Sequence, residues 1–245
     1  MLKRAIVIGA SSGMGAALVR RLVGEGYRVA AVARRADMLQ QVAEPLNRGE
    51  QRVWTYAHDV CDTSSAPDLF RDIVATLDGL DVVVYSSGVM PVIREDEFDA
   101  EIDRKIVEVN VIGAMSWLNL AASRFQVQRG GMIVGIGSVA GERGRRGNPA
   151  YCASKAALHT YLESLRNRLS RFGVHVLTVK PGPVRTPMTA HVEKMPLMIS
   201  AEEAADQIFS AMARRVDTAF VPLPWVLIMS VVRAIPSIVF RRMSF

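Results

Sequence analysis

The chain has 245 residues, of which 50% are hydrophobic and 22% are charged. This balance excludes a disordered chain and is typical of one globular domain with a large core. The formal net charge of +6 favours an anionic partner such as a nucleotide, a phosphorylated substrate or an acidic membrane surface. The arginines are scattered, so we expect no nucleic-acid partner.

Two features of composition bear on the compartment. The chain has two cysteines, Cys61 and Cys152, which are too few for a disulfide framework. Its first residues run straight into an apolar segment, without the charged and long apolar regions of a secretory signal. We therefore expect a cytoplasmic protein, and we predict no metal site.

The first predicted strand, residues 5–8, leads into a glycine-rich turn, Gly9-Ala-Ser-Ser-Gly13-Met-Gly15, and a helical pattern over 16–23. In this context the glycines allow a tight turn and let a pyrophosphate approach the free N–H groups at the helix N-terminus. The alternative is a tight turn with no ligand. The residues predicted to bind the nucleotide here are Gly9, Ser11, Ser12, Gly13, Met14 and Gly15.

The second predicted strand, residues 28–33, ends in Arg34-Arg35. A site that prefers NAD places an acidic residue here to bind the ribose 2′-hydroxyl, whereas an arginine can hold a 2′-phosphate. We therefore predict NADP(H) as the preferred cofactor, with NAD(H) as a possible one. The alternative is that both arginines belong to a solvated helix start.

Two further predicted strands, 53–57 and 81–85, end in residues suited to a nucleotide. Asp59, with Val60 beside it, follows the first of them and can accept a hydrogen bond from an adenine amino group. The second gives way to Ser86-Ser87-Gly88, whose small side chains allow backbone and cofactor to approach closely.

A Ser-Tyr-Lys set gives the chain its predicted chemistry. Ser138 follows the apolar strand 132–136, and Tyr151 and Lys155 lie four residues apart in a predicted helix, 149–172, which puts both on one face. A lysine ammonium beside a phenol lowers a pKa that starts near 10, which suits acid/base work at neutral pH. The alternative, a surface pair, is weakened by the upstream serine and by the N-terminal glycine turn.

Asn110 lies on the apolar face of a predicted long helix, residues 98–125. A buried amide must be hydrogen-bonded. Asn110 is therefore either a structural clamp or the holder of a water near the Lys155 ammonium, and the two roles are compatible.

Six strands alternating with helices, the last strand being 175–180, predict a doubly wound parallel sheet of the Rossmann type. A loop through His191 and Lys194 has no periodic pattern and is expected to act as a lid. A final amphipathic helix, 201–214, completes the pattern. We predict a single domain over residues 1–218, followed by an apolar and basic tail over 219–245.

Together these motifs resemble the short-chain dehydrogenase/reductase family over nearly the whole chain. The resemblance implies that Gly9, Gly13 and Gly15 form the phosphate turn and that Asp59 contacts the adenine. One departure is Tyr85-Ser86-Ser87-Gly88, where the family usually has Asn-Asn-Ala-Gly. The further cofactor contacts that it implies are Gly88, Tyr151, Lys155, Pro181, Gly182, Val184 and Thr186.

The resemblance also implies a reaction, the reduction of a ketone to a secondary alcohol. Ser138 would bind the substrate carbonyl, and Tyr151 would protonate it as hydride arrives from the nicotinamide. Lys155 would lower the Tyr151 pKa and bind the nicotinamide ribose, while Asn110 would anchor a water. Members of the family commonly form homodimers or homotetramers. A nucleotide-sensing or structural protein that kept the fold and lost the reaction is a further alternative.

Two segments bear on the identity of the substrate, a basic loop and the tail. Arg143, Arg145 and Arg146 lie between Ser138 and Tyr151 and could hold a phosphate, or else form a solvated loop or pair with a partner subunit. Residues 140–146, residues 181–191 and the end of the tail, 233–242, are also similar to reductases of polyprenyl-phosphate-linked keto sugars. The alternative substrate is a soluble acyl, steroid or small ketone.

The uncharged run within the tail, residues 218–232, is shorter than the roughly 20 residues that span a bilayer. With Trp225 and arginines around it, the tail could lie in a membrane interface as a peripheral contact. The alternative is that it packs over the sheet edge or against a partner subunit.

Overall fold

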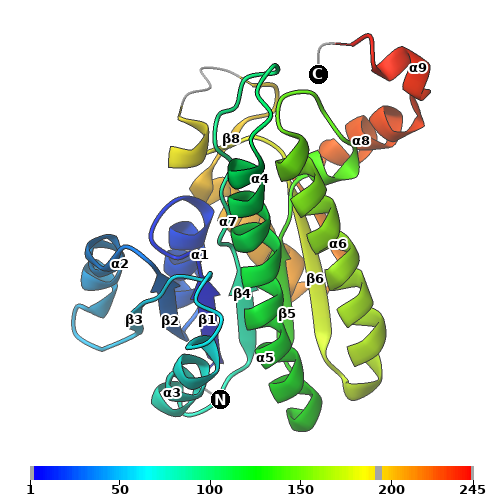
Figure 1. Cartoon of the computed structure of the whole chain (residues 1–245). Helices are drawn as coiled ribbons and strands as arrows, with labels where there is room; N and C mark the ends of the chain where they lie inside the picture. The colour runs from blue at the N-terminus through cyan, green and yellow to red at the C-terminus, as the bar shows by residue number, and fades with distance from the viewer. Residues whose placement is uncertain (1–2, 191–194, 244–245) are drawn as a thin grey trace.

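A seven-stranded parallel sheet forms the centre of the computed structural model, which describes residues 3–190 and 195–243 (Figure 1). All of its neighbouring strands are parallel. Their order, β3-β2-β1-β4-β5-β6-β9, is that of a doubly wound sheet and confirms the predicted fold class. The strands are β1 (Lys3–Ile8), β2 (Tyr27–Ala33), β3 (Val53–Ala57), β4 (Val82–Tyr85), β5 (Met132–Ile136), β6 (His175–Pro181) and β9 (Thr218–Val221).

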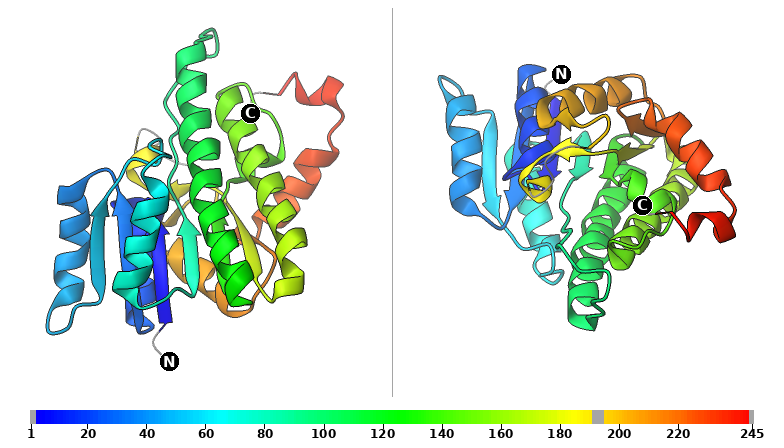
Figure 2. Two further views of the ribbon diagram at one scale, coloured as in Figure 1. Left: turned by 60° about the horizontal axis from the view of Figure 1, so that its bottom comes forward. Right: turned by 90° about the horizontal axis from the view of Figure 1, so that it is seen from above.

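Helices cover both faces of this sheet, as the two views in Figure 2 show. Alternate residues of β1 point to opposite sides: Ala5 and Val7 join one core cluster, and Ile6 and Ile8 join the other. The first cluster is closed by α1 (Gly13–Gly24), α2 (Ala36–Ala43) and α7 (Ala201–Ala213). The second is closed by α3 (Ala66–Leu77), α5 (Gly113–Gln128) and α6 (Pro149–Leu169).

The segment predicted as one long helix, residues 98–125, is not a single regular α-helix. It consists of α4 (Ala100–Val107), a π-helical turn (Glu108–Ile112) and α5. Among the described residues, the stretch 100–128 is the one helix long and apolar enough to cross a membrane, with a mean hydropathy of 1.3. Because 56% of that window is buried within the structure, it behaves as the core helix of a globular domain.

The tail is partly integrated into the domain. The boundary expected after residue 218 falls inside β9, which pairs with β6 and forms the edge of the sheet. Two helices follow, α8 (Trp225–Ala234) and α9 (Ser237–Phe240), and lie beside the N-terminal end of α6 (Figure 1). The inner face of α8 packs on Val139 through Trp225, Met229 and Val232.

The loop expected to form a lid has structure at its ends. Two short parallel strands, β7 (Val184–Arg185) and β8 (Ile199–Ser200), pair with each other, and a 3-10 turn covers Pro187–Thr189. The centre of the expected lid, residues 191–194, lies outside the described residues.

Candidate active site

Ser138 is held at the carboxyl end of β5. Its backbone is extended, with φ −171°, and it caps the 3-10 turn η3 (Val139–Glu142) by accepting a hydrogen bond from Ala140 N at 3.0 Å. The strand therefore places the Ser138 hydroxyl at the carboxyl edge of the sheet, where ligands of doubly wound folds bind.

Tyr151 and Lys155 project from the first turns of α6. Asn148 caps this helix by accepting from Tyr151 N at 3.0 Å, and Pro149 fits its first position. The Lys155 Nζ lies 5.7 Å from the centre of the Tyr151 ring, which confirms that both side chains share one helix face. Both are buried, and Ser138 is close enough to the phenol to act on the Tyr151 pKa. The structure thus brings Ser138, Tyr151 and Lys155 together.

The electrostatics of the phenol differ from the prediction. Burial is the largest influence on Tyr151 and raises its pKa, while Ser138 and the charge of Arg145 act in the opposite direction. Burial also lowers the pKa of Lys155 to about 8, and its Nζ donates to the Ile136 carbonyl at 3.0 Å. The expected lowering of the Tyr151 pKa by Lys155 is therefore not seen. The phenol keeps its proton at neutral pH, the form that a general acid requires.

Asn110 is fully buried in the π-helical turn. Its Oδ1 accepts from Val89 N at 2.8 Å, and its Nδ2 donates to Val89 O at 3.1 Å and to Ser154 Oγ at 3.0 Å. Both amide protons are thereby used within the protein. Asn110 is a structural clamp that ties the chain after β4 to α6.

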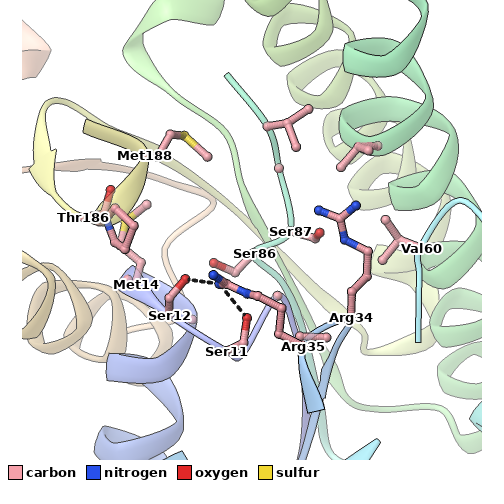
Figure 3. A pocket seen from close by; sticks show the side chains of 18 of the residues that line it. Ser11, Ser12, Met14, Arg34, Arg35, Val60, Ser86, Ser87, Thr186 and Met188 are labelled. Carbon is pink, nitrogen blue, oxygen red and sulfur yellow. Dashed lines mark hydrogen bonds between the residues drawn. The ribbon is translucent and has the colours of Figure 1, made fainter. Parts of the chain in front are cut away.

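A cavity of about 180 Å³ opens beside this set, at the carboxyl ends of β1, β2, β3 and β4. Gly88 connects the two, because a Cβ built on it would lie 3.3 Å from Asn110 Oδ1 and 3.4 Å from Lys155 Nζ. Figure 3 shows the serines and arginines that line the cavity. Asn110 and Lys155 therefore lie next to the cavity wall at Gly88.

The glycine turn at the mouth of this cavity fits a pyrophosphate. A Cβ on Gly9 would lie 2.5 Å from Ser87 N, and one on Gly15 would lie 2.1 Å from Gly9 O, so neither position admits a side chain. Ser12 precedes α1 without capping it through its side chain, and the first turn of α1 contains no acidic residue. The helix N-terminus is thus left to attract an anion.

The two arginines after β2 both line the cavity (Figure 3). Arg35 Nη2 donates to Ser11 Oγ at 3.0 Å and to Ser12 Oγ at 2.8 Å, which holds its guanidinium against the glycine turn. Arg34 Nη1 lies 3.7 Å from Asp59 Oδ2. Arg35 is therefore the better placed of the two for a ribose 2′-phosphate.

Most residues predicted to bind the cofactor line this cavity: Gly9, Ser11, Ser12, Gly13, Met14, Gly15, Arg34, Arg35, Asp59, Val60, Gly88 and Thr186. Five of the predicted residues are not among its lining residues: Tyr151, Lys155, Pro181, Gly182 and Val184. Gly182 is packed against the Trp225 ring, and Val184 is buried in β7. The sequence reasoning missed the lining residues Ala33, His58, Val89, Val109, Pro187 and Met188. Ala33 and His58, at strand ends, could have been found from their place in the pattern.

The basic loop does not have the expected arrangement. Arg143 Nη1 donates to Val232 O at 2.5 Å and to Ile235 O at 2.6 Å, and its guanidinium lies 3.9 Å from the centre of the Phe240 ring. Arg146 Nη2 donates to Arg241 O at 2.5 Å. These two arginines bind the tail of their own chain, because the ends of α8 and α9 leave carbonyls that need donors.

Glu142, at the end of the turn after Ser138, is a buried charged residue that the sequence reasoning missed. Its side chain is 5% exposed and pairs with Lys180 at 2.7 Å and with Arg233 at 3.4 Å. A hydrogen bond with His159 is the largest influence, and together with Lys180 it lowers the pKa of this carboxyl to about 2. The turn beside Ser138 therefore contains a buried and ionised carboxylate.

This carboxylate makes stability depend on pH. Because its folded pKa lies below the ordinary 4.5, its stabilising effect is present above pH 4.5 and is lost as the pH falls towards 2. We expect Glu142→Gln to lower the free energy of unfolding at pH 7 by up to about 3 kcal/mol, with the deficit shrinking below about pH 4.5. Urea unfolding between pH 3 and 7 measures this, with exposed Glu163→Gln as the control. A deficit independent of pH would contradict it.

Comparison with known proteins agrees with this geometry. The profile of the short-chain dehydrogenase family matches residues 3–197. An uncharacterized oxidoreductase of Myxococcus xanthus is 34% identical over 224 residues, which are 91% of this chain and 88% of that protein. An uncharacterized oxidoreductase of Staphylococcus epidermidis is 32% identical over 76% of this chain and 80% of its own length.

Solved structures give the same result. A variant of the actinorhodin polyketide ketoreductase determined with NADPH has a TM-score of 0.80 at 25% identity, covering 89% of this chain and 95% of that one. A short-chain dehydrogenase of Burkholderia cenocepacia in complex with NADP has a TM-score of 0.78 at 25% identity, covering 89% and 87%. The chain belongs to the short-chain dehydrogenase/reductase family and is an oxidoreductase of that family.

Proposed function

We propose that the protein reduces a ketone to a secondary alcohol with NADPH. The observation that carries the proposal is the convergence of Ser138, Tyr151 and Lys155 beside a cavity whose other end is formed by the glycine turn and Arg35. The Arg35 guanidinium favours NADPH over NADH as the cofactor. NAD(H) is the second choice. The two family members determined with NADP or NADPH support the same preference.

In this proposal the residues of the chain prepare the carbonyl for reduction. NADPH, when bound, supplies the hydride. Ser138 donates a hydrogen bond to the carbonyl oxygen, and Tyr151 gives that oxygen its proton as charge develops on it. Lys155 contributes a positive charge in the same buried space and binds the nicotinamide ribose.

A panel of ketones tests the proposal. Purified protein should oxidise NADPH in the presence of at least one small, acyl, steroid or sugar ketone and should form the matching alcohol. NADH should be a poorer donor. Absence of alcohol with every ketone would overturn the proposal and would favour a protein that only senses nucleotide.

For the substrate we infer a keto sugar linked to a polyprenyl phosphate, as in the decaprenylphosphoryl-2-keto-pentose reductase that the loops and tail resemble. The inference is supported by the outer face of α8 and α9, where apolar side chains are exposed next to arginines. Residues 218–245 contain no acidic side chain. Such a face fits an anionic lipid surface, so we propose peripheral contact with the inner face of the membrane. The exposed residues are Leu223, Leu227, Val231, Arg233, Ile238, Val239, Arg241 and Arg242.

Of the three arginines in the basic loop, only one is proposed to act on the substrate. Since Arg143 and Arg146 bind tail carbonyls, Arg145 is the loop residue proposed to act on the substrate, because its charge reaches Tyr151. The resemblance to the family extends the proposal to a homodimer or homotetramer. A soluble ketone remains the alternative substrate.

Vesicle sedimentation tests the membrane contact. We expect binding to vesicles that contain phosphatidylserine, and Val231→Glu should weaken it about tenfold, through a lost apolar contact and an added negative charge. Val127→Glu is the matched control, because Val127 is 85% exposed on α5 and Val231 is 65% exposed on α8. Equal binding of both variants, or no binding of the wild type, would favour the soluble substrate.

A further inference from the structure

The His159 ring lies against the backbone that presents Ser138. Its Nε2 accepts a hydrogen bond from Ser138 N at 3.3 Å. A Cβ built on Gly137 would lie 2.2 Å from that nitrogen, and one on Gly141 would lie 2.7 Å from His159 Cε1. The imidazole therefore fills the space between the two glycines on either side of Ser138.

The other ring nitrogen faces a carboxylate. His159 Nδ1 lies 3.5 Å from Glu142 Oε1, which is also paired with Lys180 at 2.7 Å. Because Nε2 accepts from a backbone N–H, the proton of a neutral ring must be on Nδ1, where it can be donated to Glu142. The Nδ1–H tautomer can then hydrogen-bond with both the Ser138 N–H and the Glu142 carboxylate.

The charged groups around the ring favour its neutral form. Glu142 approaches from η3, Lys180 from β6 and Lys155 from α6 itself. Burial and the two lysines lower the pKa of His159, against the effect of Glu142. The ring is thus neutral at the pH where Tyr151 works, and Nε2 remains an acceptor.

We propose that His159, oriented by Glu142, is a positioning residue for Ser138. The ring anchors the backbone N–H of Ser138 and so fixes the direction in which the hydroxyl points. Without this acceptor, a partly buried N–H loses its partner and the turn can shift. The proposal rests on the proposed function, in which Ser138 binds the carbonyl oxygen.

Two variants separate positioning from mere packing. His159→Phe fills the same space but neither accepts nor donates, whereas His159→Gln keeps an acceptor and a donor at similar reach. We expect Phe to lower kcat for the reduced ketone on the order of tenfold to a hundredfold, the scale of a misplaced catalytic group. The Kd for NADPH should stay within about twofold, and Gln should restore most of kcat. Equal kcat in all three proteins, or equal loss in both variants, would overturn the proposal.

A second readout needs no substrate. The ¹⁵N NMR spectrum of the histidine rings, assigned by comparison with His159→Gln, should show His159 as the neutral Nδ1–H tautomer near pH 7. A crystal structure of His159→Phe should show a displaced Ser138 hydroxyl. A protonated ring, an Nε2–H tautomer or an unmoved Ser138 would overturn the inference. A wild type inactive on every ketone would instead overturn the proposed function, and these two measurements would still decide the role of His159.

Discussion

Tyr151→Phe is expected to lower kcat for ketone reduction about a thousandfold, the scale of losing a general acid and a hydrogen bond to a developing oxyanion. The ring is 9% exposed, and Phe fills the same space, so folding and cofactor binding should be nearly unchanged. Only the phenol O–H is lost. Steady-state NADPH oxidation measures kcat, and nucleotide titration measures the Kd.

Tyr161→Phe is the matched control for this variant. Tyr161 is on the same helix, and its hydroxyl donates to Asn119 Oδ1 at 2.8 Å, away from the cavity. Its removal should change kcat by less than about twofold, because the lost hydrogen bond lies away from the cavity. If Tyr151→Phe kept more than about a tenth of wild-type kcat, the phenol would not be the proton donor.

Arg35→Ala is expected to weaken NADPH binding about tenfold to a hundredfold, the value of charge-assisted hydrogen bonds to a phosphate. NADH lacks the 2′-phosphate, so its Kd should change much less. The ratio of the two dissociation constants, measured by nucleotide fluorescence, reports this selectivity directly.

This experiment can distinguish a 2′-phosphate contact of Arg35 from a structural role. Its guanidinium also bonds to Ser11 and Ser12, so a purely structural role in holding the glycine turn would weaken both nucleotides equally. Equal weakening would therefore contradict a 2′-phosphate contact. Arg48→Ala removes the same charge from an exposed position after a 3-10 turn and should leave both constants unchanged.

The parts of the fold predicted from sequence are those where a local pattern is sufficient. The apolar run before Gly9 and the helical pattern after Gly15 fix a strand, a turn and a helix, because each is determined by its own residues. The spacing of Tyr151 and Lys155 likewise fixes their common face. The doubly wound parallel sheet followed from the alternation of strands and helices.

Other features depend on contacts between distant segments. The strand Thr218–Val221 has only four residues inside a longer uncharged run, and its partner β6 is what makes it a strand. The hydrogen bonds of Arg143 to α8 join residues about ninety positions apart, which no local pattern reveals. The burial that raises the Tyr151 pKa is also a property of the packed fold.

His159 shows a signal that was present but not used. It follows Lys155 by the same interval that separates Lys155 from Tyr151, so all three lie along one helix face. The spacing alone does not distinguish an active-site residue from a core histidine. Its position between Gly137 and Gly141, from which its positioning role is proposed, comes only from the three-dimensional structure.

Transfer of deuterium from NADPH that carries two deuterium atoms at the reactive nicotinamide carbon tests the central claim most directly. Mass spectrometry of the alcohol formed by the wild-type protein should find one deuterium on the former carbonyl carbon, and Tyr151→Phe should form almost no labelled product. Alcohol without deuterium, or no alcohol from any ketone, would contradict the claim that this site reduces a carbonyl with NADPH.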